Sequence, residues 1–107
     1  MTLFEFLDGY GLPWYRQGSA PQELPETFLT EWMFDRLPFM LHDNDVQSVT
    51  GVYSICLYTR RPGALIILDD FCRKAKEKGF IVRTLPRDIA SGVEGYYGRQ
   101  IELYDIE

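Results

Sequence analysis

The sequence predicts a small α+β domain in which two helices pack on a mainly antiparallel, four-stranded sheet, in the order α-β-β-α-β-β. Residues 52–58 alternate apolar and polar side chains, which is the period of a strand. Residues 60–63, Arg-Arg-Pro-Gly, interrupt that run, and residues 64–78 then repeat apolar side chains with the period of an amphipathic helix. A chain of 107 residues can bury one core, so we expect residues 1–107 to form a single domain.

The first helix and the first strand have clear local signals. Thr2 and Glu5 match a capping box, in which each side chain binds the other residue's backbone N–H at a helix start. Apolar residues follow at helical spacing until Gly11. Residues 27–35 then alternate and predict the first strand, with apolar side chains on both faces.

Residues 12–25 connect that helix to that strand. They contain three prolines and one glycine, so the sequence predicts an extended connection without regular structure. Trp14 and Tyr15 lie in its middle and are too large and apolar to be left in solvent. Two interpretations stay open for this pair, which either packs on the chain's own core or contacts a neighbouring subunit.

The second half of the chain predicts the main core. Further strands are expected at residues 80–85 and 96–106, joined by a loop over residues 86–95. The apolar stripe of the helix at residues 64–78 should pack on one face of the strand at 52–58. The side chains that meet there are expected to be Leu68, Phe71 and Ala75 with Tyr53, Ile55 and Leu57.

The other side of this helix is polar. Asp69 with Arg73 and Asp70 with Lys74 are spaced as i,i+4 ion pairs, which is typical of a solvated face. Ile66 lies on the same side, and we expect it to be exposed.

Composition limits the possible partners. The formal net charge of −5 speaks against tight nucleic-acid binding, which depends on Lys and Arg. Aromatic residues make up 15% of the chain, more than a small core needs, and the surplus predicts an interface. No apolar run approaches the ~20 residues that span a membrane, and acidic Glu5 and Asp8 do not fit a signal peptide. We therefore expect a protein that is intracellular when made and has no membrane partner.

Residues 42–45, His-Asp-Asn-Asp, bring together side chains that can bind a metal ion. A calcium loop counted from Asp43 needs a glycine at its sixth position and a glutamate at its twelfth, where the chain has Ser48 and Ser54. A turn held by Asx side chains explains the same residues, so no metal is predicted.

Catalysis is not predicted either. His42 is the only histidine, and Cys56 and Cys72 lie at core-type positions, where thiols are inert and reduced. The acidic pair Asp69 and Asp70 belongs to the solvated helix face. We predict no enzyme activity, no catalytic residues and no cofactor.

Two other short motifs bear on binding. Residues 92–95, Gly-Val-Glu-Gly, match the GXXG pattern of nucleic-acid-binding loops, but Glu94 and the flanking strands favour an ordinary hairpin connection. Arg60 and Arg61 could hold a partner's carboxylate or phosphate, or could be solvated turn residues. With Trp14, Tyr15 and Ile66, they complete the candidate interface residues.

Taken together, the order of features resembles the tail-terminator, or tail-completion, proteins of siphophages and prophages. The likeness covers nearly the whole chain, although each of its motifs is short. It rests on the N-terminal helix, residues 11–15 (Gly-Leu-Pro-Trp-Tyr), 25–30 (Pro-Glu-Thr-Phe-Leu-Thr), 43–45 (Asp-Asn-Asp), the strand at 52–58, 78–80 (Lys-Gly-Phe) and 94–97 (Glu-Gly-Tyr-Tyr).

The resemblance implies a structural protein that forms a hexameric ring. Such a ring caps the tail tube at full length and offers a docking surface to the connector, or head-closure protein, of the filled head. DNA passes the lumen without specific binding, and the protein lies in the virion at the head–tail interface after assembly in the bacterial cytoplasm. Two alternatives remain: another head–tail connector or neck protein, and a ferredoxin-like module that binds a small ligand.

Overall fold

The structure is a computed structural model that describes residues 1–42 and 45–106. Within these ranges, only the backbone is described for residues 36–42, 45–50 and 106. The elements in chain order are α1 (Leu3–Tyr10), β1 (Trp14–Arg16), β2 (Thr27–His42), β3 (Asp45–Thr59), the 3-10 helix η1 (Pro62–Leu65), α2 (Ile66–Glu77), β4 (Ile81–Ile89) and β5 (Tyr97–Ile106).

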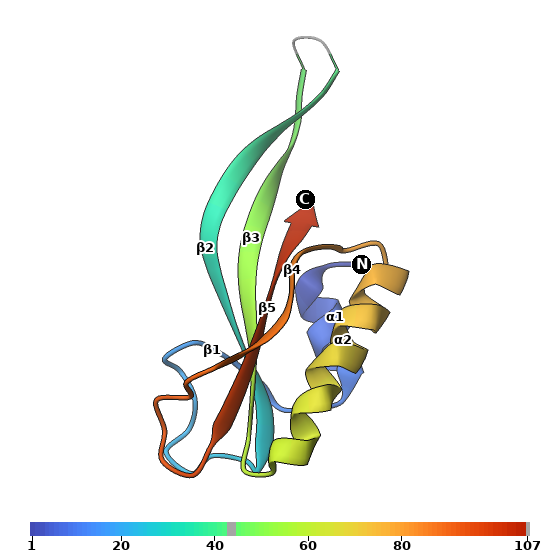
Figure 1. The fold of residues 1–107 in the computed structure, drawn as a ribbon. Coiled ribbons are helices and arrows are strands. Elements are labelled where there is room, and N and C mark those ends of the chain that lie inside the picture. Colours follow the sequence, from blue (N-terminus) through green and yellow to red (C-terminus); the bar gives the residue numbers. More distant parts are fainter. Residues whose placement is uncertain (43–44, 107) are drawn as a thin grey trace.

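The strands form one five-stranded mixed sheet in the order β1-β2-β3-β5-β4 (Figure 1). β1 runs parallel to β2, and the other neighbouring strands are antiparallel. The predicted four-stranded antiparallel sheet with the order α-β-β-α-β-β is therefore wrong, because the order is α-β-β-β-α-β-β. The additional strand, β1, lies in the connection for which the sequence predicts no regular structure.

β1 depends on contacts between residues that are distant in sequence. It is three residues long and aligns Trp14 with Leu29 and Arg16 with Glu31. The Arg16 Nε lies 3.0 Å from the Glu31 Oε1, and the Gln17 N–H donates to the Glu31 carbonyl at 2.9 Å. A strand held this way has no local pattern of its own, which is why the sequence did not indicate it.

The helix boundaries follow the local signals. The Glu5 N–H donates to the Thr2 hydroxyl and the Thr2 N–H to the Glu5 carboxylate, so the predicted capping box is confirmed. Gly11 ends α1 with a φ of 102°, a conformation that favours glycine. Pro62 opens η1, where its missing N–H costs no helical hydrogen bond. No helix in the described ranges is both long and apolar enough to cross a bilayer.

Both helices cover the same face of the sheet, here called the helix face, and leave the opposite, open face without a helix (Figure 1). Phe71 of α2 is fully buried, and the Phe6 ring of α1 lies 5.0 Å from it. The predicted core is confirmed, because one buried cluster contains Leu68, Phe71 and Ala75 together with Tyr53, Ile55 and Leu57.

β2 and β3 form a hairpin that extends well beyond the helices (Figure 1). Both strands are longer than the expected 27–35 and 52–58, and the molecule measures 51 × 25 × 23 Å. Residues 43 and 44 of the predicted polar turn lie outside the described residues.

β4 is also longer than expected. It continues through Pro86 to Ile89, and its pairing with β5 shifts between Val82 and Thr84 and again between Thr84 and Arg87. A proline is tolerated here because β4 lies at the edge of the sheet.

Candidate functional site

The residues considered for metal binding, 42–45, lie outside the part of the chain whose side chains the structure describes. Among the side chains that the structure does describe, no three from His, Cys, Asp or Glu are placed to share a metal ion. Asp43 and Asn44 lie outside the described ranges. For His42 and Asp45, only the backbone pairing of the two strands is described.

The two cysteines are free and buried, as their apolar context predicts, and they lie on different elements. The Cys56 Sγ lies on β3, 3.7 Å from the Ser54 hydroxyl. Cys72 lies on α2, and burial raises the pKa of its thiol. A thiol that stays protonated is a poor nucleophile, so Cys72 does not have the surroundings of a reactive cysteine.

Asp70 connects the two helices. The Tyr10 hydroxyl donates to its carboxylate at 2.7 Å, and Arg73 and Lys74 both pair with it. The Tyr10 bond, followed by the bonds from these two cations, holds the pKa of Asp70 below its usual value. The expected Asp70–Lys74 pair is confirmed at 3.4 Å, and this carboxylate has a structural role.

Trp14 and Tyr15 point to opposite faces of the sheet. The Trp14 ring stacks on Phe4 at 5.8 Å, and its Nε1 donates to the Asp8 carboxylate at 2.8 Å. The Tyr15 ring meets Phe28 edge-on at 5.9 Å. Both residues thus contact their own chain while staying partly exposed. Their role between subunits remains a prediction.

Arg60 and Arg61 lie at the end of β3 where three loops meet. The Arg60 guanidinium lies over the Tyr96 ring at 5.2 Å, and the Tyr96 hydroxyl donates to the Pro25 carbonyl at 2.8 Å. Arg61 forms an exposed pair with Glu26 at 3.5 Å. Both arginines stay exposed, so contact with a partner is still a prediction for them.

Exposed apolar side chains lie at several places on the described surface, and three of these bear on an interface. Ile66, at the start of α2, is 66% exposed, as its helical position predicts. Trp32 and Phe34 are partly exposed on β2, and Ile81 and Leu85 are exposed on β4. The sheet therefore carries exposed apolar groups near both of its ends.

The open face is covered along only part of its length. Near the start of β2, Phe28 is 3% exposed because the rings of Tyr15, Tyr58 and Tyr96 surround it at 5.4 to 5.9 Å. Burial raises the pKa of Tyr58 to about 12, so its phenol stays neutral. This aromatic cluster buries part of the open face, as the two helices bury the helix face.

Further along β2 this cover is missing. Trp32 is 45% exposed and Phe34 is 42% exposed, and the Arg83 guanidinium lies 5.9 Å from the Phe34 ring. Arg83 and Arg87 both face Glu102, at 3.7 and 3.8 Å. The Glu102 carboxylate is thus shared by two guanidinium groups. The same surface exposes two aromatic rings, and aromatic and arginine side chains are enriched in protein interfaces.

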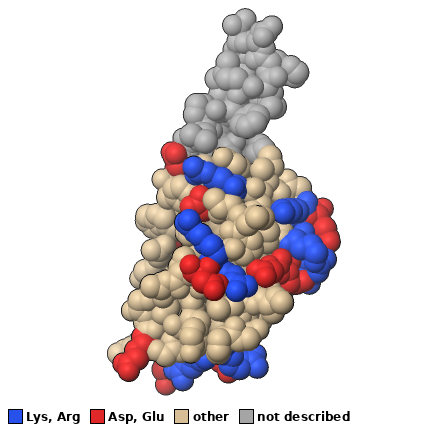
Figure 2. Space-filling view, viewed as in Figure 1, with Lys and Arg blue, Asp and Glu red and all other residues tan. Residues whose placement is uncertain are grey.

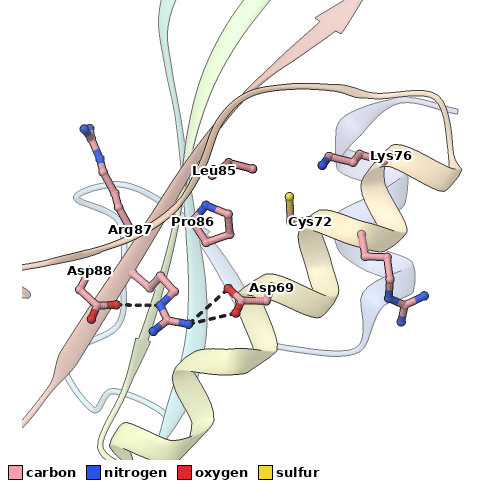
Figure 3. Close-up of a pocket in the computed structure, with 9 residues that line it drawn as sticks. Asp69, Cys72, Lys76, Leu85, Pro86, Arg87 and Asp88 are labelled. Atoms are coloured by element: carbon pink, nitrogen blue, oxygen red, sulfur yellow. Dashed lines mark hydrogen bonds and ion pairs between the residues drawn. The ribbon is translucent and has the colours of Figure 1, made fainter.

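A groove of about 600 Å³ lies between α2 and β4 (Figure 3). Leu85 from β4 and Lys76 from α2 point into it. Arg99 bridges Asp88 at 2.7 Å and Asp69 at 3.2 Å. The expected ion pair between Asp69 and Arg73 is therefore wrong, because the Asp69 carboxylate pairs with Arg99 of β5 instead. The groove is open, and its central charges already neutralise one another.

Charge is mixed over the visible face of the molecule. Figure 2 shows acidic and basic side chains interspersed over α2 and β4, without a continuous basic patch. Nucleic acid is bound by clustered cations, so this face offers it no extended contact.

Sequence reasoning placed Trp32 and Phe34 in a strand but did not identify them as surface residues. Their strand is apolar on both faces, and alternation alone does not say which face the helices cover. Leu85 was missed because Pro86 was taken to end the strand. A proline within an otherwise strand-like run is a signal of an edge strand and would have indicated the exposure.

Comparison with known protein families, with curated proteins and with solved structures finds no match.

Proposed function

We propose that the chain is a non-enzymatic structural subunit of the tail-terminator kind. In this proposal it forms a hexameric ring that ends the tail tube and gives the head connector its docking surface. The subunit acts in the virion at the head–tail interface after assembly in the bacterial cytoplasm.

One observation carries the proposal: the sheet exposes apolar side chains at two different places, on β2 and on β4. Trp32 and Phe34 lie near one end of the sheet, and Ile81 and Leu85 lie on the strand at the other end. A cyclic ring needs two unlike, complementary surfaces on every subunit, because each contact joins one surface to the other. A single self-complementary patch would give a dimer instead.

The resemblance to tail terminators supplies the biological setting, and the charge of the chain agrees with it. A net charge of −5 suits a ring whose lumen must pass DNA without holding it. The candidate contacts named from the sequence, Trp14, Tyr15, Arg60, Arg61 and Ile66, stay part of the proposal as docking residues.

A head-closure or neck protein would use the same ring geometry and differ in its partner. Binding to the connector, without binding to the tail tube, would favour that alternative. A small-ligand module is supported less well, because the groove between α2 and β4 is open. Small-molecule sites bury most of their ligand.

The test is the mass of the purified protein, by light scattering at several concentrations, alone and with tail-tube protein. We expect rings at high concentration or on the tube, and capping of tube ends seen by electron microscopy. A chain that stays monomeric in all these conditions and does not bind tube protein would contradict the proposal.

A further inference from the structure

The sheet has two free edges. On one side, β1 pairs only with residues 29–31 of β2, and β2 continues over residues 32–42 without a partner on that side among the described residues. On the other side, β4 is the last strand and has β5 as its only strand neighbour in the described sheet. Both ends of the described sheet therefore have an edge with no neighbouring strand, interrupted by Pro38 in β2 and Pro86 in β4, which have no backbone N–H.

These edges are long enough to pair. β4 has nine residues, and the free part of β2 is longer. Natural proteins commonly protect edges by making the edge strand very short, by covering it, or by placing prolines, charges or bulges in it. β4 is not short and has no strand on its outer side in the described sheet, although Pro86 and two shifts of register interrupt it. It exposes Leu85 by 71% and Ile81 by 51%. The part of β4 before Pro86 therefore has the apolar side chains and backbone N–H groups that suit it to receive another strand.

The charges on β4 argue against pairing with a second β4. In an antiparallel pair centred on Leu85, Arg83 of each chain would face Arg87 of the other. Like charges directly opposite each other destabilise a sheet. The free edge of β2 begins with the exposed Trp32 and Phe34, and the next two residues, Asp35 and Arg36, have opposite charges, so pairing with this edge does not place two pairs of arginines opposite each other.

Strand direction agrees with this choice. Successive antiparallel pairings from β2 through β3 and β5 make β4 run opposite to β2. Subunits related by a rotation axis along the strands would keep these directions, so β4 of one would meet β2 of the next as an antiparallel strand.

We propose that β4 of one subunit pairs with the free edge of β2 of the next subunit, so that one sheet continues from subunit to subunit around the ring. The occupant of each edge is a second copy of this chain. The inference rests on the ring-forming part of the proposed function and specifies the contact that forms it.

Two blocked variants test the contact. The first, Ile81→Lys with Leu85→Lys, places cations on the β4 edge. The second, Trp32→Lys, places one on the β2 edge. Each should keep the melting temperature of the isolated subunit, since these side chains are exposed, and each alone should stay monomeric at the concentrations where the wild type assembles. The concentration for half-assembly should rise by about tenfold or more in each, as expected when a buried apolar contact is lost.

The decisive measurement is the mixture of the two variants. A head-to-tail contact leaves one intact β4 edge and one intact β2 edge, so the mixture should form a 1:1 heterodimer and nothing larger. Light scattering and native mass spectrometry read the mass. Val93→Lys is the matched control, because Val93 is an exposed aliphatic residue in the loop before β5, and this variant should assemble like the wild type.

Other outcomes overturn the inference. If one blocked variant alone forms a dimer, the contact is between like edges. If the wild type forms rings and both blocked variants do so as well, the ring uses another surface, and the proposed function survives without this contact. A wild type that is monomeric with and without tube protein removes both proposals.

Discussion

Arg16→Ala tests how β1 is held to the sheet. The Glu31 side chain is 1% exposed, and its Oε1 lies 3.0 Å from the Arg16 Nε. Its Oε2 is buried without a hydrogen-bond partner. Removing Arg16 leaves a buried carboxylate without a cation, and breaking a buried pair in this way costs about 3 to 5 kcal/mol. Because Arg16 is 57% exposed and water can take its place, we expect about 3 kcal/mol, near the lower limit.

Urea unfolding followed by circular dichroism measures this loss. A second variant, Arg16→Ala with Glu31→Met, should recover most of it, because it replaces the unpaired charge by an apolar side chain of similar size. Recovery would show that the cost comes from the buried carboxylate and not from the loss of the arginine stem.

Arg61→Ala is the matched control. It removes an ion pair in which both side chains are exposed, Arg61 with Glu26, so the free energy of unfolding should change by less than about 1 kcal/mol. The reasoning is refuted if Arg16→Ala costs no more than this control, or if the double variant is no more stable than Arg16→Ala.

The elements with local signals were predictable from the sequence. The capping box placed α1, the period of apolar residues placed α2, and β5 begins within one residue of the expected position. The pairing of α2 with β3 in the core also followed, because two adjacent apolar stripes are most simply buried on each other. In all these cases the signal and the structure lie within the same short segment.

The elements that depend on distant partners were not predictable. β1 exists because Arg16 reaches the buried Glu31, and nothing within its three residues indicates a strand. The order of strands has the same origin, because β4 joins the sheet beside β5 and leaves β3 in the interior. Periodicity gives the faces of a strand and not its neighbours.

The candidate surface was only partly predictable for a related reason. Phe28 and Trp32 share the open face, four residues apart on one strand, yet Phe28 is 3% exposed and Trp32 is 45% exposed. The difference comes from tyrosines of three other segments, which gather around Phe28. Alternation treats the two positions alike. Only the folded structure shows that the tyrosine rings cover Phe28 and not Trp32. In the proposed ring, a neighbouring subunit would cover the open face from Trp32 onward.

Three further predictions follow from the packing and the charges. Phe71→Ala should lower the free energy of unfolding by about 3 to 5 kcal/mol, since the ring is fully buried, whereas Ile66→Ser should change it by less than about 0.5 kcal/mol. Urea unfolding measures both values. If Ile66→Ser proves the more damaging of the two, the assigned orientation of α2 is wrong. Trp14→Ala should cost about 2 kcal/mol, because it removes an aromatic stack and a hydrogen bond to α1; an unchanged melting temperature would contradict this and favour a role between subunits. Tyr10→Phe should weaken the acid dependence of stability, because the phenol bond lowers the pKa of Asp70 in the folded state. A carboxyl group with a lowered pKa stabilises the fold above its unfolded-state pKa, and that stabilisation is lost as the pH falls through the folded-state pKa. Unfolding measured between about pH 6 and about pH 3 should therefore show a smaller loss in the variant than in the wild type, and equal losses would mean that the phenol does not set this pKa.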